Sequence, residues 1–151
     1  MAYRVLALPG AVFLAALALS GTSSPAFAAE PIDECGACHW QYPAYYLPKR
    51  SWDALMANLG DHFGEDASLP KDVRDQVAAY LEAHAADAGD KGKEPSRYLI
   101  DLAPNMTPLR ITDTPWWNDA HGLIDFSGVA RSDIKSAANC TACHAGLSPQ
   151  K

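Results

Sequence analysis

The four cysteines of the chain fall into two identical frames, each followed directly by a histidine. One frame is Cys35-Gly36-Ala37-Cys38-His39 and the other is Cys140-Thr141-Ala142-Cys143-His144. This Cys-x-x-Cys-His pattern is the attachment signature of c-type haem. Two thiols add to the vinyl groups on one edge of the porphyrin, and the adjacent histidine ligates the iron from one side. The sequence therefore predicts two covalently bound haem c groups. The predicted attachment points are Cys35, Cys38, Cys140 and Cys143, and the predicted proximal iron ligands are His39 and His144.

Three other uses of these cysteines fit the sequence less well. Two disulfides are the usual expectation for four cysteines in an exported protein, but they leave the repeated frame unexplained. A zinc ribbon rarely has a histidine directly after a cysteine, and here Cys38 and Cys140 lie far apart in the sequence. A thioredoxin-like site needs a βαβ context, which the sequence does not show.

The sixth ligand of each iron decides what the haems can do. A haem with one protein ligand can bind oxygen, nitric oxide or peroxide, whereas two strong ligands close the iron and suit electron transfer. The chain has five histidines, so His62, His84 and His121 remain as candidates. Met56 and Met106 are the candidate methionines once Met1 is removed.

His62 follows a segment in which apolar residues recur at helical spacing, namely Trp52, Leu55, Met56 and Leu59. It lies near the buried stripe of this predicted helix, at or just beyond an end set by Gly60. A polar side chain placed there needs a partner, which an iron would provide. The alternative is a histidine that interacts with free carbonyls at the helix end. We favour His62 as an iron ligand.

Of the other candidates, His121 is the one we favour as a ligand. It follows Trp116 and Trp117, which could form a wall against a haem, although a surface histidine on an aromatic turn has the same pattern. His84 closes an amphipathic segment that begins near Pro70, and we interpret it as a helix-end residue. Met56 has the spacing of a core residue. Met106 lies between two prolines in a predicted loop and is the best non-histidine alternative.

The first 28 residues have the order of a secretory signal. Arg4 is their only charge, an apolar run covers residues 5–19, and Ala26-Phe27-Ala28 forms a small-residue cleavage site. The alternative is a membrane anchor, but the run is shorter than the roughly 20 residues that span a bilayer. We therefore expect cleavage after Ala28, export to the periplasm and no stable membrane anchor.

The net charge argues against one class of partner. Loss of Arg4 with the signal changes the formal charge from −6 to −7. Nucleic-acid binding requires a positive surface, so nucleic acid is not expected as a partner. The acidity favours a partner with a basic surface, or serves only to keep an exported monomer in solution.

The charged segment 89–96 contains glycine and almost no apolar residue, and it predicts a linker. It separates a first haem domain, residues 29–88, from a second, residues 97–151. The second half is rich in proline and shows only one possible short helix, at residues 132–139. No convincing strand pattern appears. Aromatic residues after the first motif should pack around the first haem or the local core: Trp40, Tyr42, Tyr45, Tyr46 and Trp52.

Segments of both halves are similar to those of one known family. Beside Glu34 and Asn139, which precede the motifs, they are Leu47-Pro48, Ser51-Trp52, His62-Phe63-Gly64, Tyr80-Leu81, Arg110-Ile111-Thr112, Thr114-Pro115-Trp116 and His121. In these segments the chain resembles the soluble dihaem cytochromes c (DHC) of proteobacteria. The resemblance implies a mainly α fold with much irregular structure. A class I cytochrome c-like N-terminal haem domain would join a small, irregular C-terminal haem domain. Only residues 29–34 precede Cys35, which leaves little room for the N-terminal helix of class I cytochromes.

The resemblance also implies the ligands, the activity and the partners. His62 and His121 become the sixth ligands, so both haems are low-potential bis-histidine centres of an electron carrier rather than an enzyme. The implied redox partner is a high-spin, oxygen-binding cytochrome c or a membrane cytochrome b. Proximity in the sequence favours His62 for the first haem and His121 for the second, with a crossed arrangement as the alternative. The competing interpretation is a haem enzyme or gas sensor with one open iron.

Overall fold

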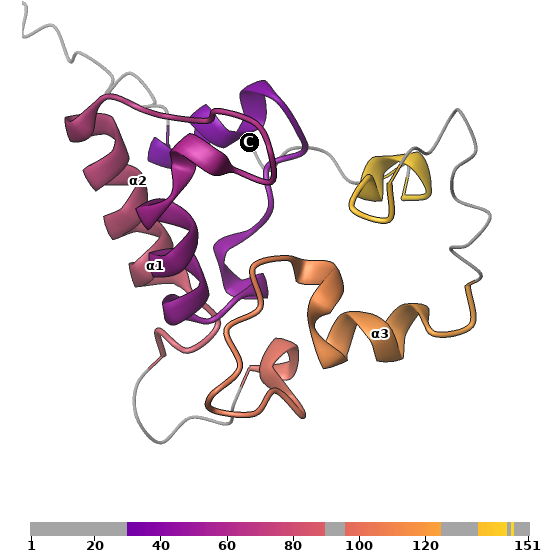
Figure 1. Ribbon diagram of the computed structural model, residues 1–151. Coiled ribbons are helices and arrows are strands. Elements are labelled where there is room, and N and C mark those ends of the chain that lie inside the picture. Colours follow the sequence, from indigo (N-terminus) through magenta and orange to yellow (C-terminus); the bar gives the residue numbers. More distant parts are fainter. Residues whose placement is uncertain (1–29, 90–95, 125–135, 145, 147–151) are drawn as a thin grey trace, which may run out of the picture.

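The computed structural model describes residues 30–89, 96–124, 136–144 and 146, and it is mainly helical. Its α-helices are α1 (Lys49–Ala57), α2 (Lys71–His84) and α3 (Pro115–His121) (Figure 1). Short 3-10 helices are η1 (Pro31–Ala37), η2 (Ala44–Tyr46), η3 (Leu59–Asp61), η4 (Arg97–Leu99), η5 (Ile111–Asp113) and η7 (Cys140–Ala142). The described residues form no strand, only an isolated bridge between His62 and Glu65. The predicted mainly α fold with much irregular chain is confirmed.

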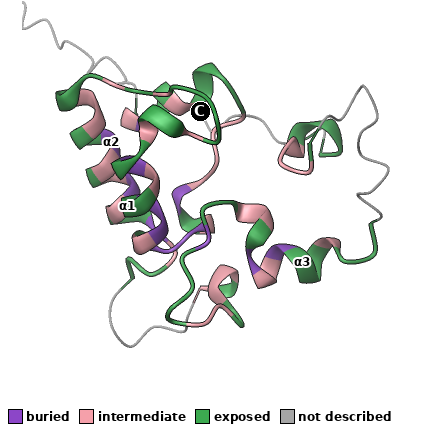
Figure 2. Ribbon diagram, in the orientation of Figure 1, coloured by how far each residue is buried: buried purple, intermediate pink, exposed green. Residues whose placement is uncertain are grey.

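The first half is built around the contact between α1 and α2. Figure 2 shows buried residues gathered where these two helices meet. The core consists of Ile32, Ala44, Leu47, Trp52, Met56, Val77, Leu81 and Ala85. Each fully buried large side chain of this kind contributes about 1.5–3 kcal/mol to folding. The two predicted helices are confirmed, and Met56 is a core residue with only 8% of its surface exposed.

Prolines precede both long helices of the first half. Pro48 and Pro70 stand directly before α1 and α2, where the fixed φ of proline favours helix initiation and its missing N–H leaves no donor unpaired. α1 ends at Ala57, before the predicted end at Gly60, and η3 continues the chain to His62. α2 ends at His84, as predicted. The short η1, which includes the first residues of the first motif, packs against α2.

The second half contains a helix that the sequence pattern did not predict. Thr114 is fully buried and its hydroxyl accepts a hydrogen bond from the Trp117 N–H at 3.2 Å, while Pro115 occupies the first turn of α3. With seven residues, α3 completes fewer than two turns, which is too short for a periodic pattern to emerge. η4 and η5 both pack against α3.

Several predictions concern residues that the structure does not describe. They are the secretory signal at residues 1–28, residues 90–95 of the linker at 89–96, and residues 132–135 of the short helix at 132–139. Residues 136–139 are described and form a turn, in which the Asn139 N–H donates to the Ser136 carbonyl at 3.0 Å. Within the described part of the chain, no helix is long and apolar enough to cross a membrane.

The two halves are joined by aromatic and polar contacts. Tyr46 from the first half stacks on Trp116 from the second, with ring centres 5.5 Å apart, and meets Tyr98 edge-on at 4.9 Å. The Arg50 side chain in α1 donates to the Met106 carbonyl at 2.6 Å. The Tyr42 hydroxyl donates to the Ala138 carbonyl at 2.6 Å, just before the second motif. Burial raises the pKa of Tyr42 to about 12, so this hydroxyl keeps its proton at neutral pH.

Candidate haem sites

The first pair of histidines brings together residues that lie 23 positions apart in the sequence. The rings of His39 and His62 have centres 6.2 Å apart, and their planes differ by 24°. An imidazole nitrogen bonds a metal at about 2 Å and lies about 1 Å from the ring centre, so two opposed ligands place their ring centres about 6 Å apart. The observed separation is that of two imidazoles with one metal ion between them.

Local contacts hold the two rings of the first pair in forms suited to ligation. The His39 Nδ1 lies 2.7 Å from the Trp40 carbonyl oxygen. Since that oxygen can only accept, Nδ1 carries the proton and Nε2 is left with its lone pair. Partial burial, followed by the charges of His39 and Arg110, lowers the pKa of His62 below its usual value. The neutral imidazole is the form that binds iron.

A tight turn after η3 presents His62. The backbone N–H of His62 donates to the Glu65 carbonyl at 2.8 Å, and Phe63 adopts a left-handed φ of 60°. This conformation costs a non-glycine residue roughly 1–2 kcal/mol. The Arg110 guanidinium lies 3.8 Å from the centre of the Phe63 ring, a cation–π contact between the two halves that helps to hold the turn.

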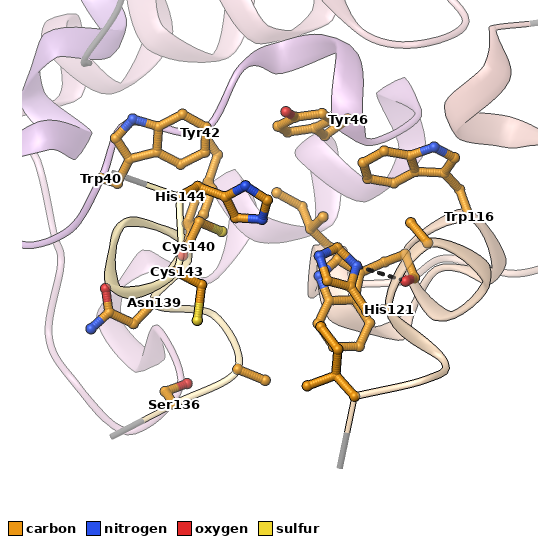
Figure 3. Close-up of a pocket in the computed structure, with 15 residues that line it drawn as sticks. Trp40, Tyr42, Tyr46, Trp116, His121, Ser136, Asn139, Cys140, Cys143 and His144 are labelled. Carbon is orange, nitrogen blue, oxygen red and sulfur yellow. Dashed lines mark hydrogen bonds between the residues drawn. The ribbon is translucent and has the colours of Figure 1, made fainter. Parts of the chain in front are cut away.

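The second pair joins the last residue of α3 to the second motif. The rings of His121 and His144 have centres 6.1 Å apart, with planes that differ by 80°. The His121 Nδ1 lies 2.9 Å from the Trp117 carbonyl oxygen, one turn earlier in the helix, so Nε2 is again the nitrogen left for a metal. Figure 3 shows the His144 ring beside Cys140 and Cys143, opposite His121.

A cavity of about 320 Å³ lies at this second pair and is lined by Cys140, Cys143, His144 and His121. Its walls also include Trp40, Tyr42, Tyr46, Trp116 and Trp117. The first three were predicted to pack around the first haem or the local core. Tyr42 does lie beside the first pair, with its ring centre 5.0 Å from that of His39. All three also line the cavity at the second pair, which their place in the sequence did not indicate. Trp52 does lie in the core, where its Nε1 donates to the Ala44 carbonyl at 2.7 Å.

A model of the dihaem cytochrome c family matches residues 32–150. The chain belongs to the dihaem cytochrome c family. It is 42% identical to a dihaem cytochrome c from Rhodobacter sphaeroides, with a TM-score of 0.69 over 83% of this chain and 93% of that one. A structure of DHC purified from the same organism is also 42% identical, with a TM-score of 0.60 over 77% and 88%.

A third solved structure extends the family likeness to another organism. It is a dihaem cytochrome c from Shewanella baltica OS155, 30% identical, with a TM-score of 0.58 over 78% of this chain and 80% of that one. No curated protein matches the sequence. As a member of this family, the protein carries two covalently attached haem c groups.

The residues of this dihaem cytochrome c fit two haems. None of the four motif cysteines is paired in a disulfide, so each sulfur remains for a thioether bond to a haem. Among the described residues no three His, Cys, Asp or Glu side chains gather as a zinc site requires. Leu123, two residues after His121, is fully exposed and offers an apolar surface. The Trp40 Nε1–H is buried without a hydrogen-bond partner, and a haem propionate is the kind of acceptor it needs.

The remaining ligand candidates lie elsewhere in this dihaem cytochrome c. His84 is exposed at the end of α2, where its Nδ1 lies 2.8 Å from the Tyr80 carbonyl oxygen and its ring stacks on that of Tyr80 at 4.2 Å. The side chain of Met106 is 42% exposed. Neither residue lines the cavity at the second pair.

Proposed function

We propose that this dihaem cytochrome c is an electron carrier with two closed, bis-histidine haems. The haem on Cys35 and Cys38 would be ligated by His39 and His62. The haem on Cys140 and Cys143 would be ligated by His144 and His121. The observation that carries the proposal is the separation of the facing rings, 6.2 Å in one pair and 6.1 Å in the other. Each half of the chain supplies both members of its own pair.

The bound haems supply one-electron exchange between ferric and ferrous iron, and the side chains set the conditions for it. Two nitrogen donors at each iron leave no position for oxygen or peroxide. Hydrogen bonds from His39 and His121 to backbone carbonyls make both imidazoles stronger donors, which stabilises the ferric state. Both effects support low potentials and a carrier rather than an enzyme.

Different surroundings at the two pairs support an internal electron path. The first pair lies beside Phe63 and Arg110, whereas the second faces the aromatic cavity. Since potentials respond to burial and to nearby charge, the two haems should differ in potential. Tyr42 connects the two sites, because its ring centre lies 5.0 Å from that of His39 and its hydroxyl binds the Ala138 carbonyl.

The proposed location and the proposed partner rest on the secretory signal and on the net charge of the mature chain. A secretory signal at residues 1–28 would deliver the protein to the periplasm, where c-type haem is attached. A mature charge of −7 favours a redox partner with a basic docking surface, such as a high-spin, oxygen-binding cytochrome c or a membrane cytochrome b.

The test is a set of visible and EPR spectra of the haem-loaded protein, with carbon monoxide added to the reduced form. Two low-spin ferric haems and no spectral change with carbon monoxide are expected from two closed irons. A high-spin signal, or prompt carbon monoxide binding at one haem, would reject the assignment. It would favour a haem enzyme or gas sensor with one open iron instead.

A further inference from the structure

The two histidine pairs differ in the orientation of their rings rather than in their spacing. The ring planes of His39 and His62 are 24° apart, close to parallel. The planes of His121 and His144 are 80° apart, close to perpendicular. The ring centres are separated by nearly the same distance in both pairs, 6.2 and 6.1 Å. The angle is therefore the main geometric difference between the two sets of ligands.

Trp117 fixes the plane of the His121 ring through two contacts. The rings stack with their centres 4.5 Å apart and their planes within 16° of each other. The Trp117 carbonyl oxygen also lies 2.9 Å from the His121 Nδ1. A ring held by a flat neighbour on one face and by a hydrogen bond at its edge cannot rotate freely about a bond from Nε2 to iron.

Trp117 is itself held firmly, so it can impose that orientation. Only 9% of its surface is exposed, and its backbone N–H donates to the hydroxyl of the buried Thr114 at the start of α3. His144 is constrained from the other side by its motif, where its backbone N–H donates to the Cys140 carbonyl at 2.9 Å. The perpendicular arrangement thus results from one ring carried by α3 and one carried by the attachment motif.

The angle between two axial imidazoles controls the electronic structure of a ferric low-spin haem. Each imidazole donates from a π orbital perpendicular to its ring into an iron d orbital of matching direction. Parallel rings both donate into the same d orbital, which separates it in energy from its partner. Perpendicular rings raise both d orbitals equally, so the two remain nearly degenerate. Axial-ligand arrangement is one of the means by which a protein tunes a haem.

We propose that Trp117 is a positioning residue that holds the His121 ring across that of His144. The second haem is then a highly anisotropic low-spin centre, distinct from a rhombic first haem. This inference rests on the proposed bis-histidine ligation. It also assigns a direction to the potentials. In the parallel pair the ferric hole occupies the raised d orbital, which eases oxidation, so the ring angle by itself makes the first haem the lower in potential.

The experiment is low-temperature EPR of the oxidised, haem-loaded protein. The expected spectrum contains two low-spin ferric signals of equal spin concentration. One has three resolved g values, and the other is a single broad feature at markedly lower field. Two rhombic signals would overturn the inference while leaving the proposed ligation intact. A high-spin signal, or carbon monoxide binding by the reduced protein, would instead show that the ligation itself is wrong.

Variants test whether Trp117 is the residue that sets the angle between the imidazole rings at the second haem. Trp117→Leu removes the flat face and should convert the low-field feature into a second rhombic signal, with a fall in the potential of one haem. Trp117→Phe retains a stacking ring and should preserve the low-field feature. Trp116→Leu is the matched control, because Trp116 lines the same cavity but stacks on Tyr46 rather than on His121.

The result stays decisive if the leucine variant does not retain its second haem. Trp117→Met fills the space with a flexible side chain that has no flat face, and it should show the same conversion to a rhombic signal. A low-field feature that survives in the haem-loaded leucine or methionine variant would overturn the role of Trp117. So would the loss of that feature in Trp116→Leu but not in the Trp117 variants.

Discussion

The two distal histidines, which are the proposed sixth ligands His62 and His121, are each held in position by a different local structure. His62 is presented by a turn in which Phe63 has a left-handed φ of 60°. His121 is the last residue of α3, with its ring against Trp117. Neither of these local structures involves the thioether bonds that attach the haems. Removal of a distal histidine should therefore open an iron without releasing its haem.

His121→Ala tests this independence at the second site. The variant should keep both haems attached, because Cys140, Cys143 and His144 are unchanged. In the reduced form one of the two haems should bind carbon monoxide, and the oxidised form should show a high-spin signal that the parent lacks. Visible and EPR spectra provide the measurement.

His84→Ala is the matched control for His121→Ala, because His84 is also the last residue of a helix and also has its Nδ1 close to the carbonyl oxygen one turn earlier. It should bind no carbon monoxide. Carbon monoxide binding in His84→Ala but not in His121→Ala would mean that His84, and not His121, is the sixth ligand of an iron.

At the level of elements, the long helices could be predicted and the short one could not. α1 and α2 bury one face against each other, so Trp52, Met56, Val77 and Leu81 recur at helical spacing. α3 buries only Trp117. Its signals are the capping residue Thr114 and the proline that follows it, and both were available in the sequence. The proline-rich surroundings outweighed them and favoured an irregular chain.

The end of α3 depends on a glycine next to the proposed ligand. A Cβ at Gly122 would lie 2.8 Å from the Asn118 carbonyl oxygen, which belongs to the backbone and cannot turn aside. Gly122→Ala must therefore shift the last turn of α3, at a cost of about 1–3 kcal/mol in the free energy of unfolding. The EPR signal and the potential of the second haem should change, while those of the first should not.

Gly89→Ala is the control for this substitution, since a Cβ there meets nothing within 4 Å. Thermal unfolding and EPR of both variants give the comparison. Equal effects at the two haems would show that the strain is not confined to α3.

At the level of the whole molecule, the two halves contact each other through aromatic and polar side chains. Sequence reasoning identified a motif and a candidate histidine in each half, and the structure brings each motif histidine to the candidate in its own half. The sequence alone could not predict that Trp40, Tyr42 and Tyr46 line the cavity at the second motif. That placement depends on how residues far apart in the chain meet, and no periodic pattern encodes it.

Tyr46→Leu tests whether the first half influences the second haem. Tyr46 lines the cavity and packs against Tyr98 and Trp116, so its loss should admit water to the second site. Water stabilises the more highly charged ferric iron, and the potential of the second haem should fall more than that of the first. Tyr45→Leu is the control, because Tyr45 belongs to the same aromatic cluster but is 39% exposed and does not line the cavity. Redox titrations monitored by EPR would follow each haem separately. A larger shift at the first haem, which lies closer to Tyr46 in the sequence, would mean that the aromatic residues serve the half that contains them.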